Sequence, residues 1–139
     1  MSGPVQWDGE LPLLTFEAAV AIETFPAFDF SVSRLDIAEY VAVTGDENDL
    51  YGELVPPGFA AVFGRGAYLQ GHRMPSGGIL LGQDIQWLKP VRIGEHLRVQ
   101  ARLTKSSYID PKRTLWFLTE ARRGKELVAR IRIVARWPL

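Results

Sequence analysis

The sequence predicts an α+β fold in a single domain, with a curved antiparallel sheet wrapped around a long central helix. Helical patterns occupy the first half of the chain, and consecutive strand patterns occupy the second half. One helical pattern is apolar on nearly every side, which is typical of a buried helix. The 139 residues suit one domain. We expect residues 1–12 to form a loose arm and residues 13–139 to form the domain.

The first half of the chain begins with a segment that fits either an extended arm or a short helix, residues 13–25. In residues 28–32 apolar and polar residues alternate, which predicts a first strand. Ser33 and Asp36 have the spacing of a capping box, so a short helix should begin there and end at Gly45.

The central helix should begin at Pro56-Pro57-Gly58, since proline suits the first turn of a helix. An apolar pattern then runs to Leu69, and a helix of about fourteen residues would be about 21 Å long. Gly64 and Gly66 lower its helix propensity, so we expect another element to pack closely against its backbone.

Four strands should follow, over residues 79–88, 96–103, 114–121 and 126–137. Their alternation predicts one packed face and one solvated face, as in an antiparallel sheet. The packed face should hold Leu97, Val99, Leu115, Phe117, Ile131 and Ile133 against Phe59, Val62, Phe63 and Leu69 of the central helix. The opposite face carries arginines, which we interpret as solvated side chains: Arg98, Arg102, Arg130, Arg132 and Arg136.

Composition excludes several classes of function. Apolar residues make up 47% of the chain, and 16 basic residues balance 16 acidic ones, so nothing favours nucleic acid or a membrane surface. There is no cysteine and no apolar run long enough to span a membrane, and the first 30 residues lack the basic start of a secretory signal. We expect a cytoplasmic protein without a metal or other cofactor, with His72 and His96 on the surface.

The segment from Thr44 to Phe59, T-G-D-E-N-D-L-Y-G-E-L-V-P-P-G-F, joins an acidic loop to a helix start. This segment and the sequence motifs at residues 34–46 and 83–95 resemble the corresponding motifs of the MaoC-like (R)-specific enoyl hydratases and 3-hydroxyacyl dehydratases. The similarity covers about Leu13 to Trp137. It implies the hot-dog fold and an acyl-CoA or acyl-carrier-protein substrate.

The loop departs from the pattern of that family, which reads Gly-Asp-x-Asn-Pro-Leu-His. Asp46 and Asn48 match, whereas Asp49 replaces proline and Tyr51 replaces histidine. A phenol titrates near pH 10, so it is a poor base at neutral pH but a competent hydrogen-bond donor or acid. Tyrosine followed by Pro-Pro also resembles the non-catalytic half of two-part members of the family.

The resemblance implies a role for each site residue. Asp46 would be the general base, Tyr51 an acid or hydrogen-bond donor, and Asn48 a brace for the loop. The backbone amides of Gly58, Phe59 and Ala60 would form an oxyanion hole, since a helix N-terminus carries partial positive charge. Asp46 could instead cap local backbone donors, and the Pro-Gly segment could be an ordinary helix start.

Three functions remain open at this point. The first is hydration, dehydration or a related proton-transfer or cyclisation reaction on an acyl-thioester or polyketide-like substrate. The second is a non-catalytic, acyl-binding partner subunit of a heteromeric dehydratase. A thioesterase is the third and weakest. For either of the first two we expect a homodimer or a hot-dog heterodimer that pairs through the sparsely charged strand at residues 79–88.

Overall fold

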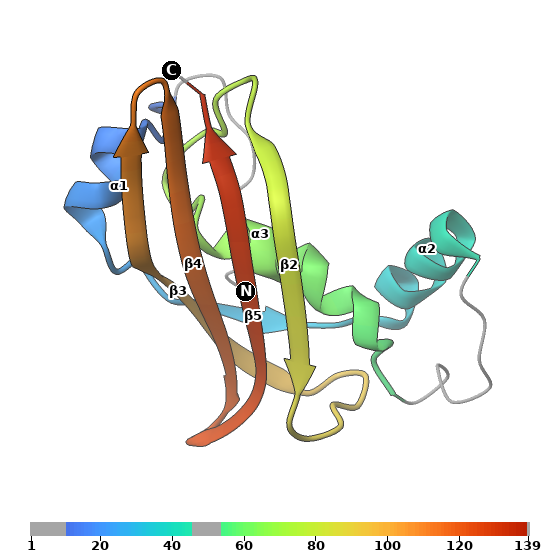
Figure 1. Cartoon of the computed structure of the whole chain (residues 1–139). Coiled ribbons are helices and arrows are strands. Elements are labelled where there is room, and N and C mark those ends of the chain that lie inside the picture. Colours follow the sequence, from blue (N-terminus) through green and yellow to red (C-terminus); the bar gives the residue numbers. More distant parts are fainter. Residues whose placement is uncertain (1–10, 46–53, 139) are drawn as a thin grey trace.

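The computed structural model describes residues 11–45 and 54–138. Its strands form one antiparallel sheet in the order β1-β3-β4-β5-β2. The bounds are Phe28–Ser31 for β1, Ile79–Trp87 for β2, His96–Ile109 for β3, Lys112–Arg123 for β4 and Glu126–Trp137 for β5. The long strands β3, β4, β5 and β2 lie side by side and curve along their length (Figure 1). The predicted α+β class and single antiparallel sheet are confirmed.

The helices precede β2 in the chain. Their bounds are Phe16–Ile22 for α1, Arg34–Thr44 for α2 and Ala60–Ala67 for α3, and a 3₁₀ turn at Pro57–Phe59 leads directly into α3. Helix α3 lies across one face of the sheet, whereas α2 projects away from it (Figure 1). The capping box predicted for α2 is present, with Ser33 and Asp36 each bonding the other's backbone N–H. The ambiguous segment at residues 13–25 contains the short helix α1.

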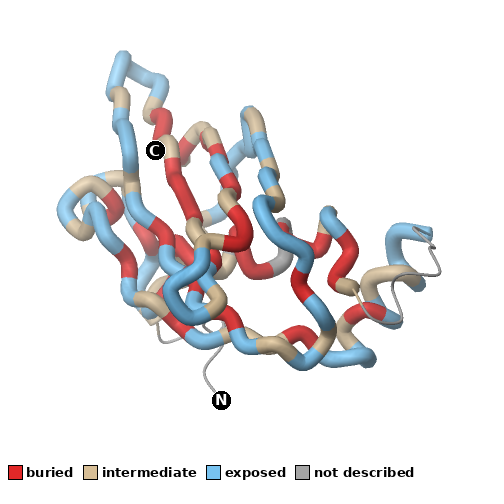
Figure 2. Tube along the Cα trace, turned by 90° about the horizontal axis from the view of Figure 1, so that it is seen from below, coloured by how far each residue is buried: buried red, intermediate tan, exposed pale blue. Residues whose placement is uncertain are grey.

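The buried residues lie between α3 and the facing side of the sheet, and they appear as the red stretches of Figure 2. Phe59 and Phe63 are buried, as are all six strand residues predicted to face them. Leu69 was predicted to be buried in the central helix, but it is half-buried and lies in the turn after α3. A Cβ added at Gly64 would come within 3.2 Å of the Ile131 side chain. The predicted close approach to the helix backbone is therefore present, and it is made by β5.

Three elements differ clearly in length from their predictions: α3, β3 and β4, of which β4 extends by two residues at each end, to Lys112–Arg123. Helix α3 has 8 residues after a three-residue 3₁₀ turn, shorter than the predicted helix. Glycines at positions 64 and 66 weaken helix propensity, and a turn already begins at Tyr68. Strand β3 continues past Leu103 to Ile109, because β4 pairs with it beyond a β-bulge between Leu103 and Lys105.

The predicted N-terminal arm lies mostly outside the described residues, which begin at Leu11. The Arg73 side chain donates a hydrogen bond to the Leu11 carbonyl at 2.5 Å, and the Arg73 backbone N–H donates one to the Pro12 carbonyl at 2.8 Å. The chain is thus fixed to the turn after α3 just before the domain begins.

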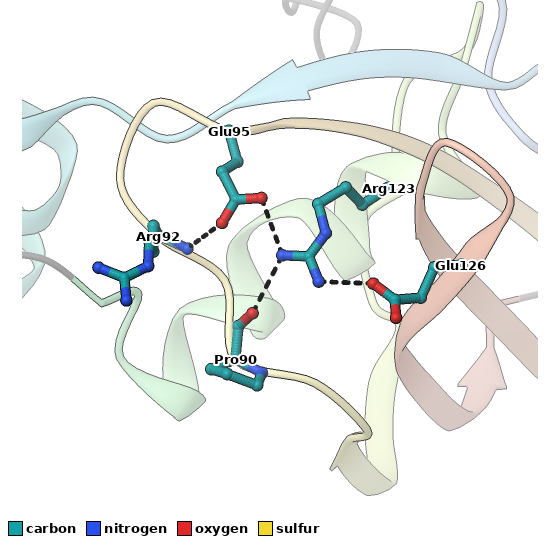
Figure 3. Close-up of polar contacts among 5 residues, drawn as sticks. All are labelled: Pro90, Arg92, Glu95, Arg123 and Glu126. Atoms are coloured by element: carbon teal, nitrogen blue, oxygen red, sulfur yellow. Dashed lines mark hydrogen bonds and ion pairs between the residues drawn. The ribbon is translucent and has the colours of Figure 1, made fainter.

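A polar cluster joins the turn after β2 to the β4–β5 hairpin (Figure 3). Glu95 accepts a hydrogen bond from the Arg92 backbone N–H at 2.8 Å and one from Arg123 at 2.8 Å. Arg123 also donates to the Pro90 carbonyl at 3.2 Å and to Glu126 at 2.5 Å. We call these five residues the turn cluster. It holds the Pro90–Glu95 turn in place beside the start of the central helix.

Candidate functional site

The start of the central helix is fixed by contacts from three elements. The Trp87 indole N–H, at the end of β2, donates a hydrogen bond to the Pro57 carbonyl at 2.7 Å. The Val55 N–H donates to the Val91 carbonyl at 2.8 Å, which ties the approach to the helix to the turn after β2. The Tyr40 ring, from α2, packs edge-on against Phe59 with ring centroids 5.6 Å apart. The helix start is therefore a rigid position in the fold.

The three backbone amides predicted to form an oxyanion hole differ in how they are used. The Phe59 N–H donates to the Pro56 carbonyl at 3.0 Å, and the Ala60 N–H donates to the carbonyls of Pro57 and Gly58. No acceptor for the Gly58 N–H lies among the described residues. Gly58 is half-buried, whereas Phe59 and Ala60 are buried. Of the three amides, the one at Gly58 is the donor left for a ligand.

Gly58 is in close contact with the hydroxyl end of Tyr40. A Cβ added at Gly58 would collide with Tyr40 Oη and would lie 3.4 Å from Tyr40 Cζ. Only glycine therefore fits at this position while the hydroxyl stays where it is. Within the described part of the chain the Tyr40 hydroxyl has no hydrogen-bond partner, although it is not sealed from solvent.

An open depression of about 310 Å³ lies beside this pair of groups. It is lined by Asp36, Glu39, Tyr40, Val43, Thr44 and Phe59. The Asp36 carboxylate is engaged in the cap of α2. The Thr44 hydroxyl donates to the Tyr40 carbonyl at 2.8 Å. The depression gives a ligand access from solvent to Tyr40 and to the helix start.

The other predicted site residues, Asp46, Asn48 and Tyr51, lie outside the described residues. The described chain stops at Gly45, which caps α2, and resumes at Leu54, which forms a β-bridge with Arg92. Both anchor points belong to elements that surround the helix start. Sequence reasoning assigned no role to Tyr40, because helical spacing alone does not show that its hydroxyl reaches a glycine eighteen positions later.

A second cavity, of about 350 Å³, lies along β2. Its lining is mainly apolar and comprises Tyr68, Met74, Gly78, Ile79, Leu80, Gln83, Ile133 and Ala135. Among the described residues β2 pairs with β5 alone, so it is an edge strand of the sheet, as predicted. Ile79 and Leu80 are each 59% exposed and Leu81 is 49% exposed. This edge combines unpaired backbone with exposed apolar side chains.

The remaining candidate groups have structural partners. His96 is exposed, and its Nδ1 lies 2.5 Å from Ser31 Oγ, while His72 Nδ1 lies 3.1 Å from the Gln70 carbonyl. Arg98 and Arg132 are exposed and form ion pairs with Asp29 and Asp84. Within the described ranges, no three His, Asp or Glu side chains gather as a metal site would require. None of the helices in those ranges is long and apolar enough to cross a membrane.

No protein-family model and no curated protein sequence matches this chain. Solved structures do match it over most of its length. The ChsH1–ChsH2 complex from Mycobacterium tuberculosis matches with a TM-score of 0.68 at 16% identity, over 86% of this chain and 93% of that chain. The (R)-hydratase from A. caviae, involved in PHA biosynthesis, matches with a TM-score of 0.64 at 20% identity, over 81% of this chain and 93% of that chain.

A third match is the C-terminally truncated HadBC complex of Mycobacterium tuberculosis, a (3R)-hydroxyacyl-ACP dehydratase. Its TM-score is 0.68 at 16% identity, over 78% of this chain and 89% of that chain. Identities this low show a shared fold and leave the activity of this chain to be argued from its own residues. The resemblance predicted from the sequence is confirmed at the level of structure: this chain has the hot-dog fold of the MaoC-like hydratases and dehydratases.

Proposed function

We propose that this protein acts on an acyl thioester, or a related polyketide-like chain, by adding or removing water across the α,β bond or by a related proton-transfer or cyclisation step. The observation that carries the proposal is the Gly58 N–H at the start of the central helix, which has no acceptor among the described residues and adjoins Phe59 and Tyr40 of a solvent-accessible depression. A donor at the positive end of a helix stabilises the negative charge that develops on a thioester carbonyl.

The proposed dehydration uses Asp46 as the base. Asp46 takes the proton from Cα of a 3-hydroxyacyl thioester, and the electron pair of that bond moves toward the carbonyl to form an enolate. The Gly58 N–H donates a hydrogen bond to the enolate oxygen. The electron pair then returns to form the α,β double bond as the Cβ hydroxyl leaves, and Tyr51 supplies the proton that makes it water. Proton transfer from Asp46 back to Tyr51 restores both groups.

The substrate carrier in this proposal is coenzyme A or an acyl-carrier protein, and Asn48 braces the loop that holds the base. Two matched structures support an acyl-thioester substrate by analogy: one is a hydratase, and the other is described as acting on hydroxyacyl-ACP. Hydratases and dehydratases catalyse the same reaction in opposite directions, so one site serves both.

The experiment compares Asp46→Asn with wild type, using crotonyl-CoA as the probe and loss of the enoyl absorbance as the readout. The substitution keeps the shape of the side chain and removes its basicity, so turnover should fall by on the order of 10² to 10⁴-fold. Asp29→Asn is the matched control, since Asp29 is an exposed acid that pairs with Arg98 on the outer side of the sheet. Unchanged turnover in Asp46→Asn with a wild-type circular dichroism spectrum would refute the assignment of the base.

Replacement of Tyr51 tests the departure from the family loop. Tyr51→Phe removes the hydroxyl that supplies the proton at Cβ, so turnover should fall; a loss much smaller than that of Asp46→Asn would mean that the tyrosine only orients substrate. Tyr51→His restores the residue found in the family. A gain of crotonyl-CoA hydration in Tyr51→His would indicate a hydratase site disabled at one position. Loss of the native activity would indicate that tyrosine is part of the mechanism.

The second candidate function is a non-catalytic subunit that completes another hot-dog protein. Two of the matched structures are complexes of differently named chains, which favours this function. The exposed apolar edge at β2 suits pairing with a second sheet in either case. We therefore propose a homodimer or a heterodimer joined through β2.

Light scattering at tens of micromolar separates these states. A homodimer with turnover of its own supports the enzyme, whereas a chain that is inactive alone and gains activity with a second hot-dog protein supports the partner subunit. Leu80→Lys places a charge on the β2 edge and should shift either assembly toward monomer, with Ile109→Lys on the β3–β4 hairpin as the exposed control. A wild-type chain that is a monomer at that concentration and also fails to pair with a second hot-dog protein would contradict the assembly.

A further inference from the structure

Tyr40 and Gly58 bring two hydrogen-bond donors close to each other. The Tyr40 hydroxyl lies close to the Cα of Gly58, since a Cβ added to Gly58 would collide with that hydroxyl. The second donor, the backbone N–H, belongs to Gly58 itself. Neither donor has an acceptor in the described part of the chain. Both residues are half-buried, so solvent reaches the donors in the empty protein and a ligand oxygen can take the place of that solvent.

Packing fixes the Tyr40 side chain in this position. Its ring contacts Phe59 edge-on, and Phe59 in turn lies 6.3 Å from Phe30 by ring centroids. The Tyr40 backbone has a contact of its own, because its carbonyl accepts a hydrogen bond from the Thr44 hydroxyl. A ring braced in this way loses little freedom when its hydroxyl meets a ligand, which lowers the entropic cost of binding.

The absence of a side chain at Gly58 is what allows the two donors to lie together. Any Cβ at this position would collide with the Tyr40 hydroxyl. The two prolines that precede Gly58 have no N–H, and the amides that follow it are used inside the helix start. The chain therefore leaves one backbone donor at this point and places one side-chain donor next to it.

We propose that Tyr40 is a further catalytic residue: its hydroxyl and the Gly58 N–H both donate hydrogen bonds to the carbonyl oxygen of the thioester and to the enolate oxygen that forms from it. An ordinary phenol keeps its proton at neutral pH, so it donates throughout and no bond to Tyr40 is made or broken. The substrate reaches the pair through the depression lined by Tyr40 and Phe59. This role rests on the proposed function, and it is separate from the proton-supplying role of Tyr51 at Cβ.

The test uses Tyr40→Phe in the full chain, with crotonyl-CoA carrying ¹³C at its carbonyl carbon as the probe. Isotope-edited infrared spectroscopy reports how strongly the bound carbonyl is polarised, because each donated hydrogen bond lowers its stretching frequency. Removal of one oxyanion donor costs on the order of 10² to 10³-fold in kcat. We expect a loss of that size in Tyr40→Phe with KM little changed, together with a carbonyl frequency closer to that of free crotonyl-CoA.

Tyr108→Phe is the matched control. It also removes one phenol hydroxyl, but from the β3–β4 hairpin, where Tyr108 contacts Phe16 and Arg113. Both variants should keep the unfolding midpoint of the wild type, and Tyr108→Phe should keep its turnover and carbonyl frequency. Equal kcat and equal carbonyl frequency in Tyr40→Phe and wild type would overturn the role of Tyr40 alone. A wild-type protein, assembled with any required partner, that neither binds nor converts the probe would contradict the proposed function as well.

Discussion

The turn cluster and the helix start lie side by side in the fold, yet they use their polar groups in opposite ways. In the turn cluster both carboxylate oxygens of Glu95 accept hydrogen bonds, and Arg123 donates to three acceptors. At the helix start the Gly58 N–H and the Tyr40 hydroxyl have no acceptor in the described part of the chain. Residues 90–92 connect the two regions, since Val91 and Arg92 pair with Val55 and Leu54.

The difference separates polar groups that build the fold from polar groups that are available to a ligand. The polar groups of a fully paired cluster have no hydrogen bond left to offer a ligand. The role of such a cluster is to fix the geometry of the two turns that it joins. A donor that packing holds in place, without a protein acceptor, is ready to bond an acceptor on a ligand. The helix start is held by apolar contacts together with hydrogen bonds from its other backbone groups and from Trp87.

The largest expected effect comes from removing those apolar contacts. Phe63 is fully buried beneath the helix start, with ring centroids 5.3 Å from Phe30 and 6.4 Å from Trp87. Phe63→Ala should lower the free energy of unfolding by about 3–5 kcal/mol, since it leaves a cavity. Urea denaturation measures the loss, and Ile109→Ala, at a residue 72% exposed, should change it by less than about 0.5 kcal/mol. A loss below about 1 kcal/mol for Phe63→Ala would mean that packing does not hold the helix start.

A smaller effect should come from forcing the two donors apart. Gly58→Ala introduces a Cβ that collides with the Tyr40 hydroxyl, and it should destabilise the protein by about 1–3 kcal/mol. Tyr40→Phe removes the hydroxyl, and the added Cβ would then lie 3.4 Å from Cζ, which is tight but tolerable. The double variant should therefore be more stable than Gly58→Ala alone. Additive effects of the two substitutions in a double-mutant cycle would show that the groups are not in contact.

The smallest expected effect is a pH dependence that arises in the turn cluster. Partial burial raises the pKa of Glu95. The hydrogen bond from the Arg92 amide, together with the hydrogen bond and charge of Arg123, lowers that pKa by a larger amount. The net result is a pKa below the ordinary value, so the folded protein binds the proton less well than the unfolded chain does. The stability that Glu95 contributes is thus present above the unfolded-state pKa of about 4.3, and it is lost as pH falls through the folded-state pKa.

Glu95→Gln measures this contribution. The difference in unfolding free energy between wild type and Glu95→Gln should be largest near neutral pH and should shrink on acidification below about pH 4. A difference that grows as the pH falls would mean that Glu95 is not held as a carboxylate by Arg92 and Arg123.

The fold could be predicted from the sequence because local patterns and tertiary structure agree in most of the chain. Alternation marked the strands, and the Ser33–Asp36 spacing marked the start of α2. The far end of β3 was missed because Lys105, Ser106 and Ser107 have the composition of a loop, and only pairing with β4 makes them a strand. The length of α3 was overestimated because its apolar character was continuous while its glycines ended the helix early.

The candidate site was predictable only in part. The Pro-Pro-Gly segment located the helix start, but the sequence does not show which of its amides is used internally. Tyr40 could not be identified, because its role depends on how α2 approaches the central helix, which is a long-range contact. Asp46, Asn48 and Tyr51 stay predictions, since they lie outside the described residues.

The exposed edge of β2 also bears on how the chain behaves while it is alone. Ile79, Leu80 and Leu81 form a short run of high β-propensity beside an unpaired row of backbone donors and acceptors, which is a template for aggregation. Two features of β2 oppose aggregation at this edge. A register shift between Leu80 and Gly82 interrupts the flat edge, and Asp84 places a charge further along the strand. Under the proposed pairing through β2, a newly made chain is most prone to aggregate before a second sheet covers this edge, and its yield on expression should depend on how quickly that sheet binds.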